Sequence, residues 1–521
     1  MSGEEERKKL VERAGVTGAG TLLSRMLGFG RDVAIAALFT RLQTDAFAAA
    51  LTIPNALRQL LAEGAVSSAV IPVLKERLTN GGEEEGKKFF ARARAISLLA
   101  LLVATVLGIA FAGPLTWLFA GGYGDSPGKL ELTASLTRVM FPYIFFMGTA
   151  ALGMAALNSK GKFSVAAFAP GLFNVGVVAA AFLLRDPLAA RGIDPSMSLA
   201  IGVLLGGVLQ VVAQWPALRA IGFMGRPVLD LRDTHVREML RRIVPMTFGL
   251  GIYYVDLVLS RRFLSELPEG SQSYFYWASR ICDFPQGIFV MALSTAALPS
   301  LATFAAKGDH VELAKTWAHG MRLAMFVAVP CSVALIAIGE PLVALVFEQG
   351  HFDAVASHET GRALAWQGGA IFTVAAVRQL VPVFHALGDT RTPVVVSALD
   401  LVAFIVLALT LRGPFGHVGV SMAIAGSSAV QMLLLFYGIR RRLPELHLGE
   451  IGKSLARIFA AAIVAGAGAW GVARILEGRR LPGLVAGILF VVLFIAVAWG
   501  TRAPELAEIA APIRRRLPSK R

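Results

Sequence analysis

Hydrophobic residues in this 521-residue chain gather in long runs separated by short polar segments. Each run supplies the roughly 20 residues that an α-helix needs to cross the hydrocarbon core of a bilayer. Gly and Pro occur inside the runs, as membrane helices tolerate. The alternating strands of a membrane β-barrel do not occur. The pattern predicts fourteen transmembrane helices, at about residues 12–40, 46–75, 91–120, 130–158, 164–185, 196–220, 236–262, 274–304, 316–338, 358–387, 392–411, 417–439, 453–475 and 482–501.

Composition supports an all-α polytopic membrane protein, since 55% of the residues are hydrophobic and the mean hydropathy is +0.64. A net charge of +15 is also typical of proteins that bind nucleic acid. With the N-terminus in the cytoplasm, however, most Lys and Arg residues fall in cytoplasmic segments, as the positive-inside rule requires. An even helix count then places both termini in the cytoplasm, with the basic residues 514–516 and 520–521 facing anionic lipid. We therefore expect no nucleic-acid partner.

An internal duplication divides the chain. Pro72 and Pro299 stand in similar apolar segments followed by polar loops, and Gly161 and Gly388 stand in similar turns between helices. Both pairs have the same separation in sequence, which predicts two homologous six-helix halves. Parallel repeats of this kind place a substrate site between them near the midplane. The predicted domains are residues 1–222 (helices 1–6), 223–443 (helices 7–12) and 444–521 (helices 13–14 and a basic tail).

Charged residues within the apolar runs are the candidate site. Arg25, Arg31 and Asp32 lie in the first run, Arg58 in the second and Arg280 in the eighth. An Arg at the centre of a spanning helix costs roughly 2.5–3.5 kcal/mol on insertion scales. Several such residues imply a buried anionic ligand, and the planar guanidinium suits a diphosphate because it binds phosphate bidentately. The alternative is structural pairing, or snorkelling of the arginines to an interface.

Spacing along the helices predicts acidic partners for these arginines. Asp32 is expected to orient or partly neutralise Arg31, and Asp283 stands one turn from Arg280. Arg58 lies one turn after Pro54, which leaves a backbone carbonyl without its helical hydrogen bond. Arg58 could bind a ligand or that carbonyl, and Glu63 is its expected structural partner.

Isolated carboxylates raise the question of a coupling ion. Asp256 and Asp400 lie within spans of the second half and are candidates for Na⁺ or H⁺ binding. Pairing with Arg261 or Arg378, or a position near an interface, is the alternative. Arg378 and His385 share a helix face that could line the same cavity, and Asp45 is interpreted as a helix cap.

Several motifs together resemble the MurJ (MviN) family of lipid II flippases. The first is Ser24-Arg25-Met26-Leu27-Gly28-Phe29-Gly30-Arg31-Asp32. The others are the segments Thr44–Phe47, Ile53–Arg58, Ala62–Ala65, Ala278–Arg280, Phe284–Gly287 and Gly388–Pro393. The resemblance covers most of residues 15–440 and is most specific in the first two helices.

The resemblance implies a fourteen-helix transporter of the multidrug/oligosaccharidyl-lipid/polysaccharide exporter superfamily. Two six-helix lobes would form a V around a central cationic cavity, and two additional C-terminal helices would hold a polyprenyl tail. Such proteins move the peptidoglycan precursor lipid II to the outer leaflet of the bacterial inner membrane and catalyse no covalent reaction. The family's essential arginines fall on Arg25, Arg31, Arg58 and Arg280, with Asp32 beside them. We expect a monomer in the phospholipid bilayer.

Two departures from the family pattern concern the second half. Ser279 stands where the family often has Asp before the arginine, and Asp256 and Asp400 each lie about one turn from the acidic sodium-site positions of some members. No cofactor is certain, and coupling to Na⁺, H⁺ or the membrane potential stays open. The potential is worth about 2.3 kcal/mol per charge per 100 mV.

Three other functions make different demands on the residues within the apolar runs. A flippase for another polyprenyl diphosphate-linked glycan needs the same residues. A drug or cation antiporter of the same superfamily would prefer acidic residues in the first half. A membrane enzyme acting on polyprenyl phosphates would need clustered Asp or His, and the sequence has none.

Overall fold

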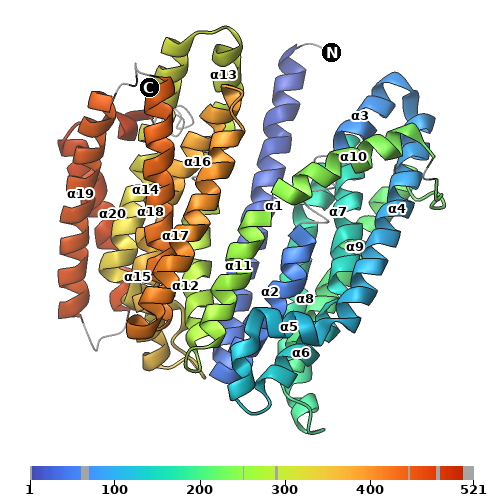
Figure 1. Ribbon diagram of the computed structural model, residues 1–521, viewed down its shortest axis with the longest axis horizontal. Helices are drawn as coiled ribbons and strands as arrows, with labels where there is room; N and C mark the ends of the chain where they lie inside the picture. The colour runs from blue at the N-terminus through green and yellow to red at the C-terminus, as the bar shows by residue number, and fades with distance from the viewer. Residues whose placement is uncertain are drawn as a thin grey trace, which may run out of the picture. The chain divides into compact units, whose positions relative to one another are not determined.

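The fold is given by a computed structural model, which describes residues 3–59, 70–230, 232–249, 251–287, 291–443, 446, 448–476 and 481–508. Side chains are described in these ranges except at 3–17, 242–249, 253 and 291–298. Within these ranges every regular element is a helix (Figure 1). The chain forms two compact units, Met1–Gln272 and Ser273–Arg521, and each is described by itself.

The first unit contains the helices up to α11. They are α1 (Gly3–Leu38), α2 (Arg41–Arg58), α3 (Ile71–Asn80), α4 (Gly82–Ala110), α5 (Ala112–Ala120), the 3₁₀ helix η3 (Gly121–Asp125), α6 (Lys129–Met140), α7 (Tyr143–Ser159), α8 (Phe163–Ala189), α9 (Met197–Ala220), α10 (Thr234–Gly249) and α11 (Gly251–Ser265). Helix α8 packs along both α1 and α9, α2 packs on α6, and α11 packs on α5 and η3.

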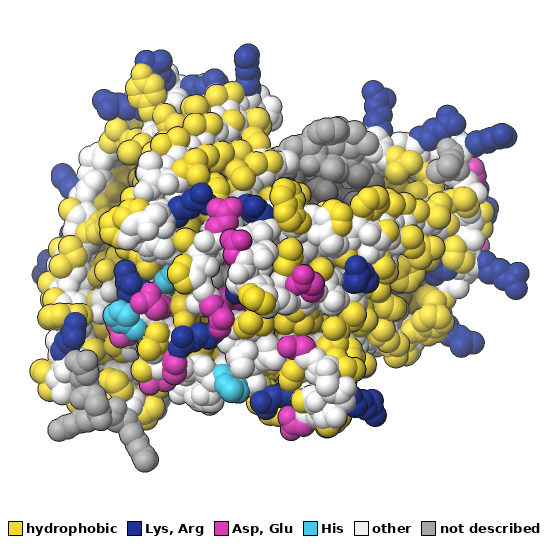
Figure 2. Space-filling view, turned by 60° about the horizontal axis from the view of Figure 1, so that its bottom comes forward, with side chains coloured by type: hydrophobic (Ala, Val, Ile, Leu, Met, Phe, Trp, Pro, Cys, Tyr) yellow, Lys and Arg dark blue, Asp and Glu magenta, His cyan; other side chains and the backbone are white. Residues whose placement is uncertain are grey.

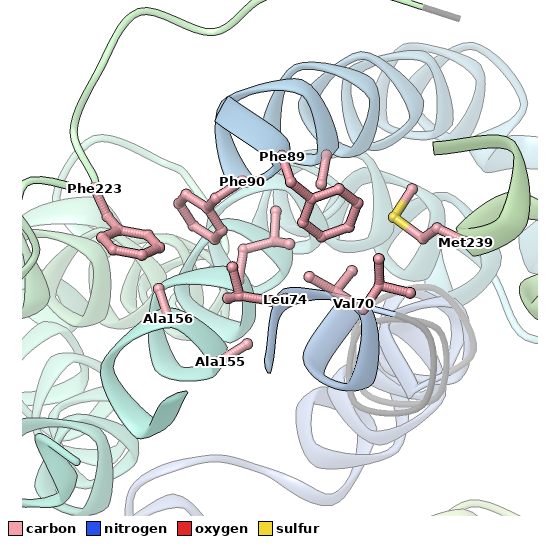
Figure 3. Close-up of a cluster of buried hydrophobic side chains, with 11 residues drawn as sticks. Val70, Leu74, Phe89, Phe90, Ala155, Ala156, Phe223 and Met239 are labelled. Carbon is pink, nitrogen blue, oxygen red and sulfur yellow. The ribbon is translucent and has the colours of Figure 1, made fainter. Parts of the chain in front are cut away.

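A buried hydrophobic cluster holds one end of this unit together (Figure 3). Phe89 and Phe90 of α4 meet Leu74 of α3, Phe223 of the segment after α9, and Met239 of α10. Each of these side chains is at most 2% exposed, and burying one such side chain stabilises the fold by about 1.5–3 kcal/mol. The cluster holds α10 against α3 and α4, although a long loop separates α10 from α9.

The second unit contains α12 (Ser271–Pro285, which begins two residues before the unit boundary), α13 (Met291–Ala306), α14 (His310–Phe347), α15 (Ala354–Gly369), α16 (Ile371–Ala386), α17 (Arg391–Phe415), α18 (His417–Arg442), α19 (Leu448–Ile475) and α20 (Pro482–Gly500). Helix α14 packs against α15, α19 and α20, whereas α18 packs against α15, α16 and α17. The unit is thus organised around two long helices.

Over the described residues, each predicted apolar run coincides with one helix or with two successive helices. The run at 130–158 is divided at Phe141–Pro142, because proline lacks the N–H that would continue the helix. Ten helices of the described residues are long and apolar enough to cross a membrane. Broad areas of hydrophobic side chains on the outer surface fit contact with lipid (Figure 2). The prediction of an all-α polytopic membrane protein is confirmed, and the count of fourteen spans stays a prediction.

The turns predicted to be duplicated have the same geometry. Gly161 and Gly388 have φ of 73° and 75°, in the left-handed region that favours glycine. In each turn the next residue donates its N–H to a carbonyl five residues back, from Lys162 to Leu157 and from Asp389 to Phe384, both at 2.8 Å. This Schellman pattern ends a helix in the same way at both places, and it also ends helices at Gly192, Gly222 and Gly308, so the duplication itself stays a prediction. The division at residues 222 and 443 stays a prediction.

Candidate functional site

Arg31 and Asp32 form a buried ion pair on α1. Arg31 is 5% exposed and Asp32 is 2% exposed. The Arg31 Nε and Nη2 atoms both donate to Asp32 Oδ1, at 2.9 and 2.5 Å. The predicted partnership of these two residues is therefore present. A buried charge of this kind is tolerated only when it is paired and hydrogen-bonded, as it is here.

Asn174 of α8 completes this pair and was not found by sequence reasoning. Its Oδ1 accepts a hydrogen bond from Arg31 Nη1 at 3.0 Å, and its Nδ2 donates to the Ser24 carbonyl at 3.0 Å. One amide thus ties α8 to both a side chain and the backbone of α1. The one signal in the sequence was a single Asn within the apolar run 164–185. In the structure this side chain is 6% exposed.

Phe173 and two glycines of α1 lie where α1 packs against α8. The Arg31 guanidinium lies over the Phe173 ring, 5.6 Å from its centre, which adds a cation–π contact. A Cβ at Gly28 would make only an ordinary contact, 3.5 Å from Asn174 Nδ2, whereas a Cβ at Gly20 would lie 2.7 Å from Ala167 Cβ, so the backbone of α1 comes closest to α8 at Gly20. Described bonds engage three of the five Arg31 N–H groups.

Arg25 and Arg58 are half-buried and belong to the same unit. Arg25 precedes Asp32 by seven residues on α1, so both lie on one helix face. The Arg58 Nε donates to Asn55 Oδ1 at 2.9 Å at the end of α2, one turn beyond Pro54. Glu63, the expected structural partner of Arg58, lies outside the described residues. Both arginine side chains are partly exposed.

Arg280 lies in the second unit, on α12. Its Nη1 atom lies 3.3 Å from Asp283 Oδ2, the pairing predicted from their spacing, and its guanidinium lies 5.7 Å from the centre of the Tyr276 ring. The Arg280 side chain is 34% exposed and Asp283 is 61% exposed. The structure therefore groups Arg31 with Asp32 in one unit and Arg280 with Asp283 in the other. Convergence of all four arginines stays a prediction.

The candidate coupling-ion carboxylates are also divided between the units, with Asp256 on α11 and Asp400 on α17. Both are partly buried. Over the residues that the structure describes, no three His, Cys, Asp or Glu side chains come together as a metal site would need. Of the predicted pair on α16, Arg378 is partly buried and His385 is exposed. The cation role of the two carboxylates stays a prediction.

The interpretation of Asp45 as a helix cap is wrong. Thr40 caps α2, and its hydroxyl accepts from the Gln43 N–H. Asp45 lies inside the helix at 1% exposure, where Lys129 Nζ and the Gly270 N–H each donate to its Oδ2 at 2.8 Å. The sequence did not reveal this because Lys129 begins a helix far along the chain.

Comparison with known proteins gives one consistent family. A family model described as "Lipid II flippase MurJ" matches residues 35–490. The lipid II flippase MurJ of Burkholderia cenocepacia is 34% identical over 82% of this chain and 84% of the relative. A probable lipid II flippase MurJ of Bdellovibrio bacteriovorus is 31% identical over 95% of this chain and 94% of the relative.

Solved structures show the same fold. The structure of a lipid II flippase MurJ in an inward closed conformation matches with a TM-score of 0.75 and 21% identity, over 92% of this chain and 97% of that chain. An inward-facing multidrug resistance transporter of the MATE family matches with a TM-score of 0.65 and 15% identity, over 83% of this chain and 98% of that chain.

Proposed function

Because the chain belongs to the lipid II flippase MurJ family, we propose that it moves lipid II from the cytoplasmic to the outer leaflet of the bacterial inner membrane. It is a multi-pass transporter and not an enzyme. In this proposal both termini are cytoplasmic and the working form is a monomer.

The single observation that carries the site proposal is the buried set of Arg31, Asp32 and Asn174. Asp32 and Asn174 hold the guanidinium in one orientation. A phosphate oxygen suits its N–H donors because a charged donor and a charged acceptor make strong, short hydrogen bonds. Arg25 and Arg58, from the same unit, would supply the charge that Asp32 cancels on Arg31. Arg280 would contribute from the second unit.

Transport in this proposal follows alternating access. The diphosphate binds the arginines from the cytoplasmic side, the sugar–peptide headgroup occupies the cavity, and the polyprenyl tail stays in lipid or beside α19 and α20. The protein then rearranges to release the headgroup outside. No covalent bond forms or breaks.

The membrane potential is the proposed energy source, with Na⁺ or H⁺ bound at Asp256 or Asp400 as the alternative. Moving one charge through 100 mV is worth about 2.3 kcal/mol. Dissipating the potential with an ionophore at constant pH and Na⁺ should slow transport. An unchanged rate would exclude this drive.

The test uses cells depleted of their own flippase and complemented with this protein, with lipid II headgroup labelled at the outer face. The parent should restore labelling. Because Arg31→Ala would leave Asp32 buried without its Arg31 partner, the pair is best removed together as Arg31→Met/Asp32→Leu. That double variant should express normally and fail to restore labelling, whereas Arg191→Ala, at an exposed loop residue, should restore it. No rescue by a well-expressed parent would transfer the proposal to another polyprenyl diphosphate-linked glycan.

A further inference from the structure

A buried amide on α15 contacts the helix that carries Arg280. Gln367 is 7% exposed, and its Oε1 accepts a hydrogen bond from Ser279 Oγ at 2.8 Å. Its Nε2 lies 3.4 Å from the Phe275 carbonyl oxygen and donates to Ser421 Oγ of α18 at 3.1 Å. One side chain therefore joins α12, α15 and α18 within the second unit.

The geometry makes this contact specific for the rotation of α12. Phe275 and Ser279 are four residues apart, so their polar atoms lie one above the other on one face of the helix. The Ser279 hydroxyl also donates to the Phe275 carbonyl at 2.9 Å, sharing its single proton between two acceptors. Gln367 meets both groups at once, and turning the helix would break both contacts.

Helix α12 needs such a contact because its far end is interrupted. Pro285 lies in its last turn, five residues after Arg280, and the two following residues are in a wider π-type turn. Proline removes the backbone N–H that would bond to the preceding turn. The last turn of α12 is therefore weakened, and side-chain contacts such as that of Gln367 help to fix the rotation of the segment that carries Arg280.

We propose that Gln367 is a positioning residue for Arg280. Its role rests on the proposed function, since Arg280 is placed there as a ligand for the diphosphate. Arg280 follows Ser279 directly, so the bond to Ser279 fixes the direction in which the guanidinium leaves the helix. A rotation of about 10° moves a group about 6 Å from the helix axis by about 1 Å. A displacement of that size weakens the bidentate binding of phosphate by arginine.

The test measures binding of lipid II, and of undecaprenyl diphosphate as a minimal probe, to the purified full chain. Gln367→Leu should weaken binding by about three- to tenfold, the range of one or two interhelical hydrogen bonds in a membrane. In an Arg280→Ala background the same change should have no further effect, because the group being positioned is gone. Thr373→Val is the matched control. It removes a buried interhelical contact between Thr373 and Ser428, 2.8 Å long, that does not involve α12, and it should leave binding unchanged.

An equal loss in both backgrounds, or none in either, would overturn the role of Gln367. If Gln367→Leu does not fold, Ser279→Ala removes one arm of the same contact and is judged in the same way. If the parent binds neither probe, the proposed function fails. Gln367 is then judged by hydrogen exchange of the amides in 273–285. Faster exchange in Gln367→Leu but not in Thr373→Val would support the contact as the restraint on α12, and unchanged exchange would overturn it.

Discussion

Removing the charge of Asp32 should destabilise the protein far more than removing a surface carboxylate. Asp32→Asn leaves the buried Arg31 without a counter-charge, although the amide and Asn174 can still accept hydrogen bonds. Breaking a buried ion pair by removing one partner costs about 3–5 kcal/mol, and the acceptors that remain favour the lower end, about 3 kcal/mol. Denaturant unfolding of the detergent-solubilised protein, followed by tryptophan fluorescence, measures this difference.

The chain contains a matched control for this substitution. Arg185 and Asp186 are also adjacent in sequence, but their charges are 3.9 Å apart and Asp186 is 85% exposed. Asp186→Asn should change the free energy of unfolding by less than about 0.5 kcal/mol. If Asp32→Asn proves no more destabilising than Asp186→Asn, the Arg31–Asp32 pair does not have the energetic role assigned to it.

Three further outcomes are expected. Asn174→Ala should lower the free energy of unfolding by about 1–3 kcal/mol, because it leaves a buried Arg31 donor without its acceptor. The same variant should reduce outer-face labelling of lipid II, and full labelling would contradict the proposed site. Gly388→Ala should destabilise by about 1 kcal/mol because φ is 75°, whereas Gly413→Ala, in open space on α17, should be neutral or stabilising in the same unfolding assay. The hydroxyl and the backbone N–H of Thr392 lower the pKa of Asp389, which lies between α16 and α17. A carboxyl whose pKa is lowered on folding stabilises the folded state at pH values above its ordinary pKa near 3.8. The difference in free energy of unfolding between the parent and Asp389→Asn should therefore be largest at neutral pH and disappear as the pH falls through the lowered pKa. A difference that persists in acid would contradict this.

The sequence predicted the helices well because each is specified locally. A run of about twenty apolar residues has one stable solution in a bilayer, and Pro142 and Pro285 mark places where helices end or weaken. The pairing of Arg280 with Asp283 was predictable for the same reason, since one turn of helix separates them.

Contacts between distant segments were not predictable from the chain. Asn174 meets Arg31 across 143 positions, and Lys129 meets Asp45 across 84. A lone Asn in an apolar run, or a Lys at a helix start, gives no indication of its partner until the packing of the helices is known. The same limit explains why Asp45 was assigned to a cap and Gln367 was not singled out.

The placement of α11 affects how the protein can be divided. By duplication α11 belongs to the second half, yet Arg262 on it donates to the Trp117 carbonyl at 2.9 Å and lies over the Trp117 ring, and Gly122 donates to Ser265 Oγ at 3.1 Å. A fragment that stops where the first repeat stops would uncover this surface of α5 and η3. A cut before α11 would force these contacts to re-form between two co-expressed pieces, whereas a cut after α11 keeps them within one piece, so the repeated sequence and the compact folding unit are different lengths of chain.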